Sequence, residues 1–117
     1  MHPWNLTLHD RACLGDGAVA YCLGRVEIGV GATVAQEAYL CSGTHNFESE
    51  RLELETAGIQ VGANAFVGLR AIVLPGIVIG SGCVIGAGSV VTRDTEDDWL
   101  YAGNPAAKIR SRGGPPK

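Results

Sequence analysis

The chain has 117 residues, enough for one domain with a small core and too few for two ordinary domains. Apolar residues make up 46% and charged residues 18%, a balance that excludes a disordered chain, and the formal net charge of −3 does not suggest a nucleic-acid partner. Seventeen glycines beside two phenylalanines predict a chain that turns often and fills its interior with aliphatic side chains.

Aliphatic residues recur every six positions from near the N-terminus. Small residues hold a second position of the same repeat, at Ala12, Ala18, Ala32 and Ala38. A period of six fits neither a helix, which repeats at 3.6, nor a half-buried strand, which repeats at 2. It is typical of a β-helix, in which three hexads close one coil of about 18 residues. The aliphatic positions are Leu8, Leu14 and Ala20 and then, after two extra residues, Ile28, Val34 and Leu40.

The repeat is strictest in the second half of the chain. Glycine directly follows four of its six aliphatic residues, which suits a corner because glycine reaches positive φ without a Cβ clash. Stacked coils place such aliphatics in register, with parallel strands about 4.8 Å apart, so these columns form the predicted core. The six positions are Val61, Val67, Val73, Ile79, Ile85 and Val91.

We therefore predict an all-β chain that forms one parallel β-helix domain over residues 1–117. About four coils are expected, interrupted by one loop over 46–60 and followed by an irregular tail over 94–117. The four coils should cover 8–27, 28–45, 61–78 and 79–93.

Residues 71–92 carry no charge, so a membrane-spanning helix is an alternative for this segment. It contains Pro75 and five glycines, and a lipid-facing helix does not require a six-residue period, so we expect no membrane insertion. The first residues lack the features of a secretory leader, and the four cysteines form no Cys-x-x-Cys pair. These features predict reduced thiols in a cytoplasmic protein.

The six-residue pattern stops after Leu40, where His45 stands in the segment 41–47. Loops that project from a rigid scaffold often carry function. An imidazole titrates near pH 6.5, so His45 is a candidate general base that could accept a hydroxyl proton at neutral pH. A backbone carbonyl, Asn46 or Glu48 could orient its ring. His2 and His9 are interpreted as solvated residues, and the acidic run 48–55 as a solvated loop face.

Four motifs carry a family resemblance, and together they cover roughly residues 3–112. They are Pro3-Trp4-Asn5-Leu6, the segment 38–45 that ends in His45, Ile85-Gly86-Ala87-Gly88-Ser89-Val90-Val91-Thr92, and Gly103-Asn104-Pro105-Ala106. The chain resembles the hexapeptide-repeat acyltransferases, in particular the colanic-acid-biosynthesis acetyltransferases, which are relatives of the galactoside and maltose O-acetyltransferases. The resemblance implies a left-handed β-helix and a homotrimer with sites between subunits.

The resemblance also implies a reaction, the direct transfer of an acetyl group from acetyl-CoA to a hydroxyl of a saccharide. His45 would be the general base, and no metal is implied. The acyl-CoA would contact the last two coils and the tail through Phe66, Leu69, Ala87, Thr92, Arg93, Lys108 and Arg110. The saccharide acceptor would lie near Tyr21, Cys22 and Ser42.

The chain departs from the pattern of these relatives at two positions. Cys22 stands where relatives often have an asparagine that faces the acceptor, and Ala107 where a lysine or arginine usually follows Gly-Asn-Pro-Ala. Cys22, and a chain start close to the first coil without the segment that relatives place before Pro-Trp-Asn-Leu, leave open a catalytically inactive β-helix scaffold, in which Phe66 and Leu69 only pack on a face. A zinc carbonic anhydrase on the same helix would need three histidine ligands per site, more than His9 and His45 provide.

Overall fold

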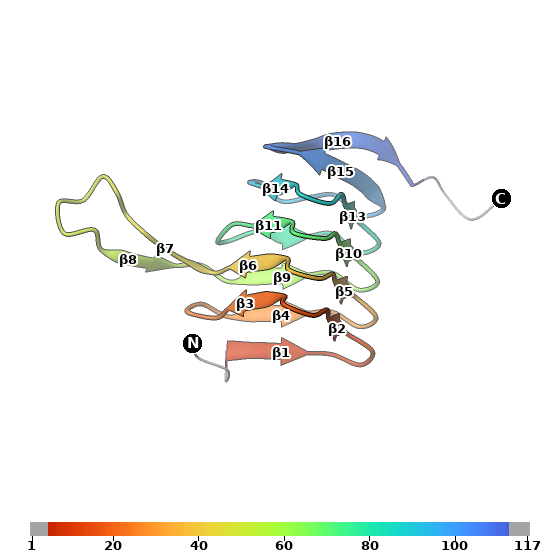
Figure 1. The fold of residues 1–117 in the computed structure, drawn as a ribbon, viewed down its shortest axis with the longest axis horizontal. Helices are drawn as coiled ribbons and strands as arrows, with labels where there is room; N and C mark the ends of the chain where they lie inside the picture. The colour runs from red at the N-terminus through yellow and green to blue at the C-terminus, as the bar shows by residue number, and fades with distance from the viewer. Residues whose placement is uncertain (1–4, 113–117) are drawn as a thin grey trace.

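The computed structural model describes residues 5–112 as a three-sided prism of short parallel strands (Figure 1). Each coil contributes one strand to each side. The first two coils contain β1 (Leu6–Leu8), β2 (Cys13–Leu14), β3 (Val19–Tyr21), β4 (Val26–Ile28), β5 (Thr33–Val34) and β6 (Tyr39–Cys41). The next two contain β9 (Ile59–Val61), β10 (Phe66–Val67), β11 (Ile72–Val73), β12 (Val78–Ile79), β13 (Val84–Ile85) and β14 (Val90–Val91).

The three sides of the prism are three parallel sheets. Face A has the order β1-β4-β9-β12, face B contains β2-β5-β10-β13, and face C has the order β3-β6-β11-β14. The predicted fold class, a β-helix of hexapeptide repeats with about four coils, is confirmed. The coils begin at residues 6, 26, 59 and 78, one or two residues before their predicted starts. The difference arises because the prediction counted from the last residue of each face A strand.

The predicted aliphatic columns form the core. Register pairs stack Ile28 on Val61 and Val61 on Ile79 in face A, and the other two faces stack in the same way. All six aliphatics from Val61 to Val91 are at most 2% exposed. Fully burying one such side chain contributes about 1.5–3 kcal/mol, so these columns supply most of the stabilisation that a chain with few aromatics has available.

The glycines that follow the aliphatics serve close approach rather than positive φ. None of Gly62, Gly68, Gly80 and Gly86 has a positive φ. A Cβ on Gly62 would lie 2.5 Å from the backbone nitrogen of Ser81 in the next coil, and one on Gly80 would lie 2.6 Å from that of Asp97. The predicted reason for these glycines was therefore wrong, because it is the neighbouring coil that leaves no room for a side chain.

The left-handed corners lie two residues further along the chain. Asn64 has φ 59° and Gly31, in the coil before it, has φ 69°. A Cβ on Gly31 would come within 2.4 Å of the Asn64 Oδ1, and one on Gly82 would collide with Oδ1 of Asp98 in the same way. The longer corner side chain thus occupies space that a glycine one coil earlier leaves open.

Two antiparallel hairpins depart from the coils. The first, β7 (Gly43–His45) with β8 (Leu54–Thr56), leaves the prism after β6 and forms the long excursion in Figure 1. The second, β15 (Trp99–Gly103) with β16 (Ala106–Ser111), extends face B, since β15 pairs with β13. The prediction of an irregular tail was wrong, because the tail forms these two paired strands. Tyr101 of β15 is 7% exposed and fills the end of the core.

Within residues 5–112, no helix is long and apolar enough to cross a membrane.

Candidate functional site

His45 is the last residue of β7, and its ring is held by the turn that leads from β7 to β8. Its Nδ1 lies 2.7 Å from the backbone carbonyl oxygen of Leu52. A carbonyl oxygen can only accept a hydrogen bond, so Nδ1 carries a proton, and in the neutral ring it is Nε2 that then has the free lone pair. Of the three groups considered for orienting the His45 ring, it is a backbone carbonyl that does so, and neither Asn46 nor Glu48 takes that role.

The turn between β7 and β8 is fixed by local hydrogen bonds. Asn46 donates its backbone N–H to the Glu53 carbonyl at 2.7 Å, and its Oδ1 accepts the N–H of Glu48 at 3.0 Å. Leu52 has φ 49°, a left-handed conformation that costs a bulky residue about 1–2 kcal/mol. The turn thus holds a strained residue in the one conformation in which its carbonyl reaches His45.

This arrangement leaves His45 accessible. The ring is exposed, and its Nε2 makes no hydrogen bond to any part of the chain that the structure describes. A neutral imidazole with a fixed tautomer and a free Nε2 can accept a proton from a hydroxyl placed beside it. One nitrogen of the His45 ring is therefore fixed by the turn, and the other is accessible to a ligand.

A hollow of about 430 Å³ lies at the base of the hairpin. Thr44, which precedes His45, lines it together with Glu55 and Thr56 of β8. Ala57 and Pro75 close it on the side of the prism. The hollow offers room for part of a small molecule directly beside the strand that carries His45.

Two of the three predicted acceptor residues are buried. Cys22 is 1% exposed, its Sγ donates to the Ala20 carbonyl, and burial raises the pKa of its thiol. Ser42 is fully buried, and its Oγ accepts the N–H of Gly24 at 2.9 Å and donates to the Tyr21 carbonyl. These two side chains hold the corner from which the hairpin leaves, and only the half-buried Tyr21 could contact a ligand directly.

The first predicted acyl-donor residues line one edge of the prism. Phe66 is 43% exposed on face B, and Leu69 is 44% exposed at the corner between face B and face C. Ala87 occupies the same corner one coil later, where the N–H of Gly88 donates to the Leu69 carbonyl at 2.8 Å. The backbone N–H groups of Leu69 and Ala87 have no hydrogen-bond partner among residues 5–112. They are therefore donors that a ligand could use.

Of the remaining predicted acyl-CoA contacts, three side chains are free and one is already bound by its neighbours. Thr92, Arg93 and Arg110 are exposed, and neither arginine forms an ion pair within the described part of the chain. Lys108 instead lies 2.5 Å from Glu96 and 4.4 Å from the Trp99 ring centroid. The hydrogen bond to Glu96 raises the pKa of Lys108, which fits an ammonium already neutralised by its neighbour.

Sequence reasoning missed Leu52, Glu96 and Trp99. The contribution of Leu52 is its carbonyl, a group that every residue has, so no side-chain pattern could have identified it. Glu96 and Trp99 could have been suspected from a strand pair in the tail, which places residues 99–103 beside 106–111, but the tail was predicted to be irregular. Over the described residues, no three side chains of the metal-binding types are grouped to hold a metal ion.

Comparison with known families supports the repeat identified above. Residues 58–93 match the family model described as "Hexapeptide repeat of succinyl-transferase". This segment contains the third and fourth coils, in which the six-residue period is strictest.

Individual relatives match over almost the whole chain. WcaF of Escherichia coli (strain K12), whose name assigns it to colanic acid biosynthesis as an acetyltransferase, is 37% identical over 111 residues, which are 95% of this chain and 61% of that protein. A Dictyostelium discoideum protein with an acetyltransferase name, DDB_G0275913, is 38% identical over 112 residues, 93% of this chain and 59% of that protein. The chain therefore spans about three fifths of the length of these relatives.

Solved structures share the fold. A maltose O-acetyltransferase from Clostridium difficile 630 has a TM-score of 0.87 and 27% identity, covering 92% of this chain and 59% of that one. AntD, an N-acyltransferase from Bacillus cereus solved with dTDP-4-amino-4,6-dideoxyglucose and coenzyme A, has a TM-score of 0.86 and 20% identity, covering 93% of this chain and 64% of that one. The left-handed β-helix and the resemblance to hexapeptide-repeat acyltransferases predicted from the sequence are confirmed.

Proposed function

From its hexapeptide repeat and its resemblance to acetyltransferases over almost its whole length, we propose that this chain transfers an acetyl group from acetyl-CoA to a hydroxyl of a saccharide. The observation that carries the proposal is the hydrogen bond of 2.7 Å between Nδ1 of His45 and the Leu52 carbonyl. It leaves Nε2 as a free base on an exposed strand. A residue with no chemical role would not require a strained turn to fix its tautomer.

In the proposed reaction, Nε2 of His45 accepts the proton of the acceptor hydroxyl. The hydroxyl oxygen attacks the thioester carbonyl, a C–O bond forms, and the C–S bond breaks. The departing thiolate takes the proton back from Nε2, which regenerates the neutral imidazole. Transfer is direct, without a covalent enzyme intermediate, and the Leu52 carbonyl stabilises the imidazolium that forms between the two proton transfers.

The corner between face B and face C fits the acyl donor. The free N–H groups of Leu69 and Ala87 stand one coil apart, about 4.8 Å, and can bind carbonyl oxygens along an extended pantetheine arm. Phe66 offers an apolar contact beside them. Arg110, on β16 at the end of face B, offers a free guanidinium group of the kind that phosphates prefer. Arg93 follows β14 and lies at the other corner of face C, the one from which the hairpin leaves.

One chain does not place the base beside the proposed donor corner. β6 runs across face C from the corner with face B to the corner where the hairpin leaves, so His45 and Leu69 lie at opposite ends of that face (Figure 1). We propose a homotrimer in which the hairpin of one subunit meets the donor corner of its neighbour. The exposed side chains of Phe47, Leu52 and Leu54 fit a hairpin that is covered in an assembly. Four free thiols fit the reducing cytoplasm as its location.

A catalytically inactive scaffold is the second candidate. It is favoured by the burial of Cys22 and Ser42 and by the engagement of Lys108, which leave fewer free ligand contacts than the resemblance implies. Such a scaffold would bind no acetyl-CoA.

The test is release of CoA thiol from acetyl-CoA with a panel of saccharides, for the parent chain and for His45→Ala. We expect turnover with at least one acceptor and a loss of about 10²-fold or more in kcat for the variant. Arg51→Ala, at the tip of the same hairpin, is the matched control and should retain parental activity. Full activity in His45→Ala would show that the mechanism is wrong, and absence of acetyl-CoA binding in calorimetry would favour the scaffold.

A further inference from the structure

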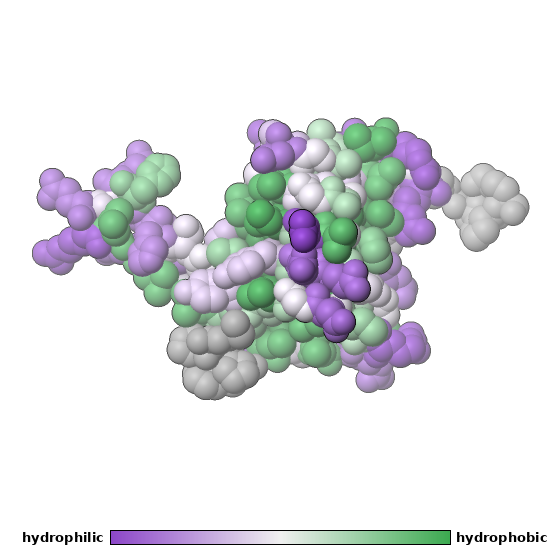
Figure 2. All heavy atoms as spheres, viewed as in Figure 1, coloured by the Kyte–Doolittle hydropathy of each residue, from purple (hydrophilic) through white to green (hydrophobic). Residues whose placement is uncertain are grey.

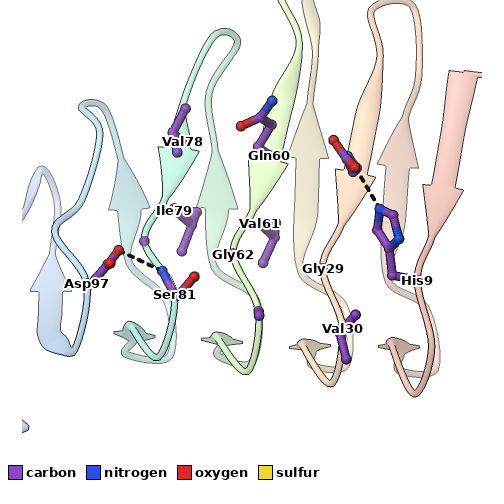
Figure 3. Close-up of a pocket in the computed structure, with 13 residues that line it drawn as sticks. His9, Gly29, Val30, Gln60, Val61, Gly62, Val78, Ile79, Ser81 and Asp97 are labelled. Carbon is purple, nitrogen blue, oxygen red and sulfur yellow. Dashed lines mark hydrogen bonds and ion pairs between the residues drawn. The ribbon is translucent and has the colours of Figure 1, made fainter.

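A trench crosses face A, well away from the donor corner. It encloses about 400 Å³ and lies where face A turns toward face B. Figure 3 shows His9 at one end and Asp97 at the other, with Gln60 and Val78 between them. None of these four side chains has a role in the function proposed above.

The floor of the trench is a column of glycines, Gly29, Gly62 and Gly80. Each is required by the stacking of coils, because a Cβ there would lie within 2.8 Å of backbone atoms in the next coil. No side chain rises from this column, so the floor of the trench is backbone alone and runs along the prism axis across successive strands. Because rigid backbone builds it, the trench needs no rearrangement to receive a ligand.

The rim presents polar groups that are fixed but only partly used. His9 Nε2 lies 2.6 Å from Glu27 Oε2, which leaves the other carboxylate oxygen of Glu27 free. Asp97 accepts the N–H of Ser81 through Oδ1 at 2.9 Å, which leaves its Oδ2 free. The amide of Gln60 has no hydrogen-bond partner in the described chain and offers both donors and an acceptor.

The spacing of these groups suits an extended ligand. Glu27 and Gln60 lie on successive levels of the prism, and Asp97 lies two levels beyond Gln60, so three coil steps, on the order of 14 Å, separate Glu27 from Asp97. Hydroxyl groups both donate and accept, so a chain of hydroxylated rings satisfies free carboxylate oxygens and an amide at once. The carboxylates of Glu27 and Asp97 oppose an anionic ligand. The chemistry therefore selects a neutral, hydroxyl-rich ligand longer than one sugar ring.

The trench is continuous with the surface that leads to the hairpin. A second hollow of about 180 Å³ shares Glu27, Gln60 and Val78 with the trench and extends to Arg25 and Gly58. Gly58 follows Ala57, which lines the hollow beside Thr44 at the base of the His45 hairpin. A ligand along face A can therefore reach the hairpin without leaving the surface of one subunit.

We propose that the face A trench is a carbohydrate site that binds the non-reacting units of a neutral oligosaccharide, an acceptor role that rests on the proposed function. The first test is calorimetric binding of maltotriose to the full chain without an acyl donor. Gln60→Ala and Glu27→Gln should each weaken binding about fivefold, the effect of losing one hydrogen bond, while Gln36→Ala at another corner should not. Trigalacturonate should bind more weakly than maltotriose, and Glu27→Gln should reduce that difference.

Binding without the donor separates this proposal from the proposed function. If His45→Ala binds maltotriose as the parent does and neither turns over, the trench stands and the transferase assignment fails. If the chain transfers acetyl groups but maltotriose does not bind, or binds equally to the parent, Gln60→Ala and Glu27→Gln, the trench proposal is overturned. Thermal unfolding of both variants should match the parent, since Gln60 is exposed and the Glu27 substitution preserves shape.

Discussion

The stacked coils and the hairpin 43–56 obey different rules, although they are joined at a single corner. In coils two to four, each strand contributes a side chain that is at most 2% exposed, whereas Phe47 in the hairpin is 80% exposed. The coils are held by aliphatic columns that span the whole molecule. The hairpin is held by the pairing of its own two strands and by hydrogen bonds within its turn, such as those of Asn46 with Glu48 and Glu53.

This difference separates stability from proposed function. Removing a core side chain should unfold the prism, and with it everything that depends on the prism. Removing a hairpin contact should change the position of the Leu52 carbonyl and leave the prism intact. The two regions can therefore be tested against each other with paired substitutions.

The largest effect on stability is expected for Leu40→Ala, which deletes a fully buried side chain of β6. The cavity should lower the free energy of unfolding by about 2–5 kcal/mol. Leu54→Ala removes the same atoms from the hairpin, where the side chain is 52% exposed in a single subunit, and should change the stability of the dissociated subunit by less than about 0.5 kcal/mol. Denaturant unfolding of both variants at one protein concentration checks the pair, and equal losses would contradict the division into two regions.

A smaller loss is expected for Gly62→Ala, which tests close approach between coils. The new Cβ would lie 2.5 Å from the Ser81 backbone nitrogen, and the resulting overpacking should cost about 1–3 kcal/mol. Gly88→Ala places a Cβ in open space but at φ 71°, so its cost should be nearer 1 kcal/mol and arise from the backbone alone. Thermal unfolding compares the two variants. If Gly88→Ala were less stable than Gly62→Ala, close approach between coils would not be the reason for the glycine at position 62.

The smallest effect on stability is expected for Asn46→Ala, in the turn that presents the Leu52 carbonyl. Loss of the hydrogen bond to the Glu48 N–H should lower the global free energy of unfolding by less than about 1 kcal/mol. If the proposed function holds, kcat should fall about fivefold because Nδ1 of His45 is less well held, with the KM for acetyl-CoA unchanged. Hydrogen exchange of amides 46–53 should become faster while that of the coils does not, and an equal change in both regions would argue against a locally held hairpin.

The coils could be predicted from the sequence because each buried position repeats at a fixed interval. The six aliphatic residues from Val61 to Val91 identified the core and the stacking of the coils. The sequence could not show whether these glycines serve positive φ or close approach, because φ and the distance to the next coil are properties of the folded backbone. The tail was mispredicted because Trp99 and Tyr101 alternate over a strand too short to show a period.

The site was predictable in its parts but not in its arrangement. The interruption of the repeat identified His45, and the free N–H groups of Leu69 and Ala87 stand at positions that the family resemblance selected. The engagement of Lys108 by Glu96 and Trp99, and the burial of Cys22, depend on which strands become neighbours. The pattern of residues along the sequence does not show which strands become neighbours. Lys108 and Cys22 were therefore predicted to contact ligands, although the structure engages one and buries the other.

The left-handed corners also constrain how such a chain can evolve. Asn64 occupies the space that Gly31 leaves open, and Asp98 occupies the space above Gly82. A substitution that adds a side chain to either glycine displaces the longer residue one coil later, so the two positions should change together or not at all. Among homologous sequences, correlated exchange at these pairs would therefore record the stacking order of the coils, including across the hairpin that separates Gly31 from Asn64 in sequence.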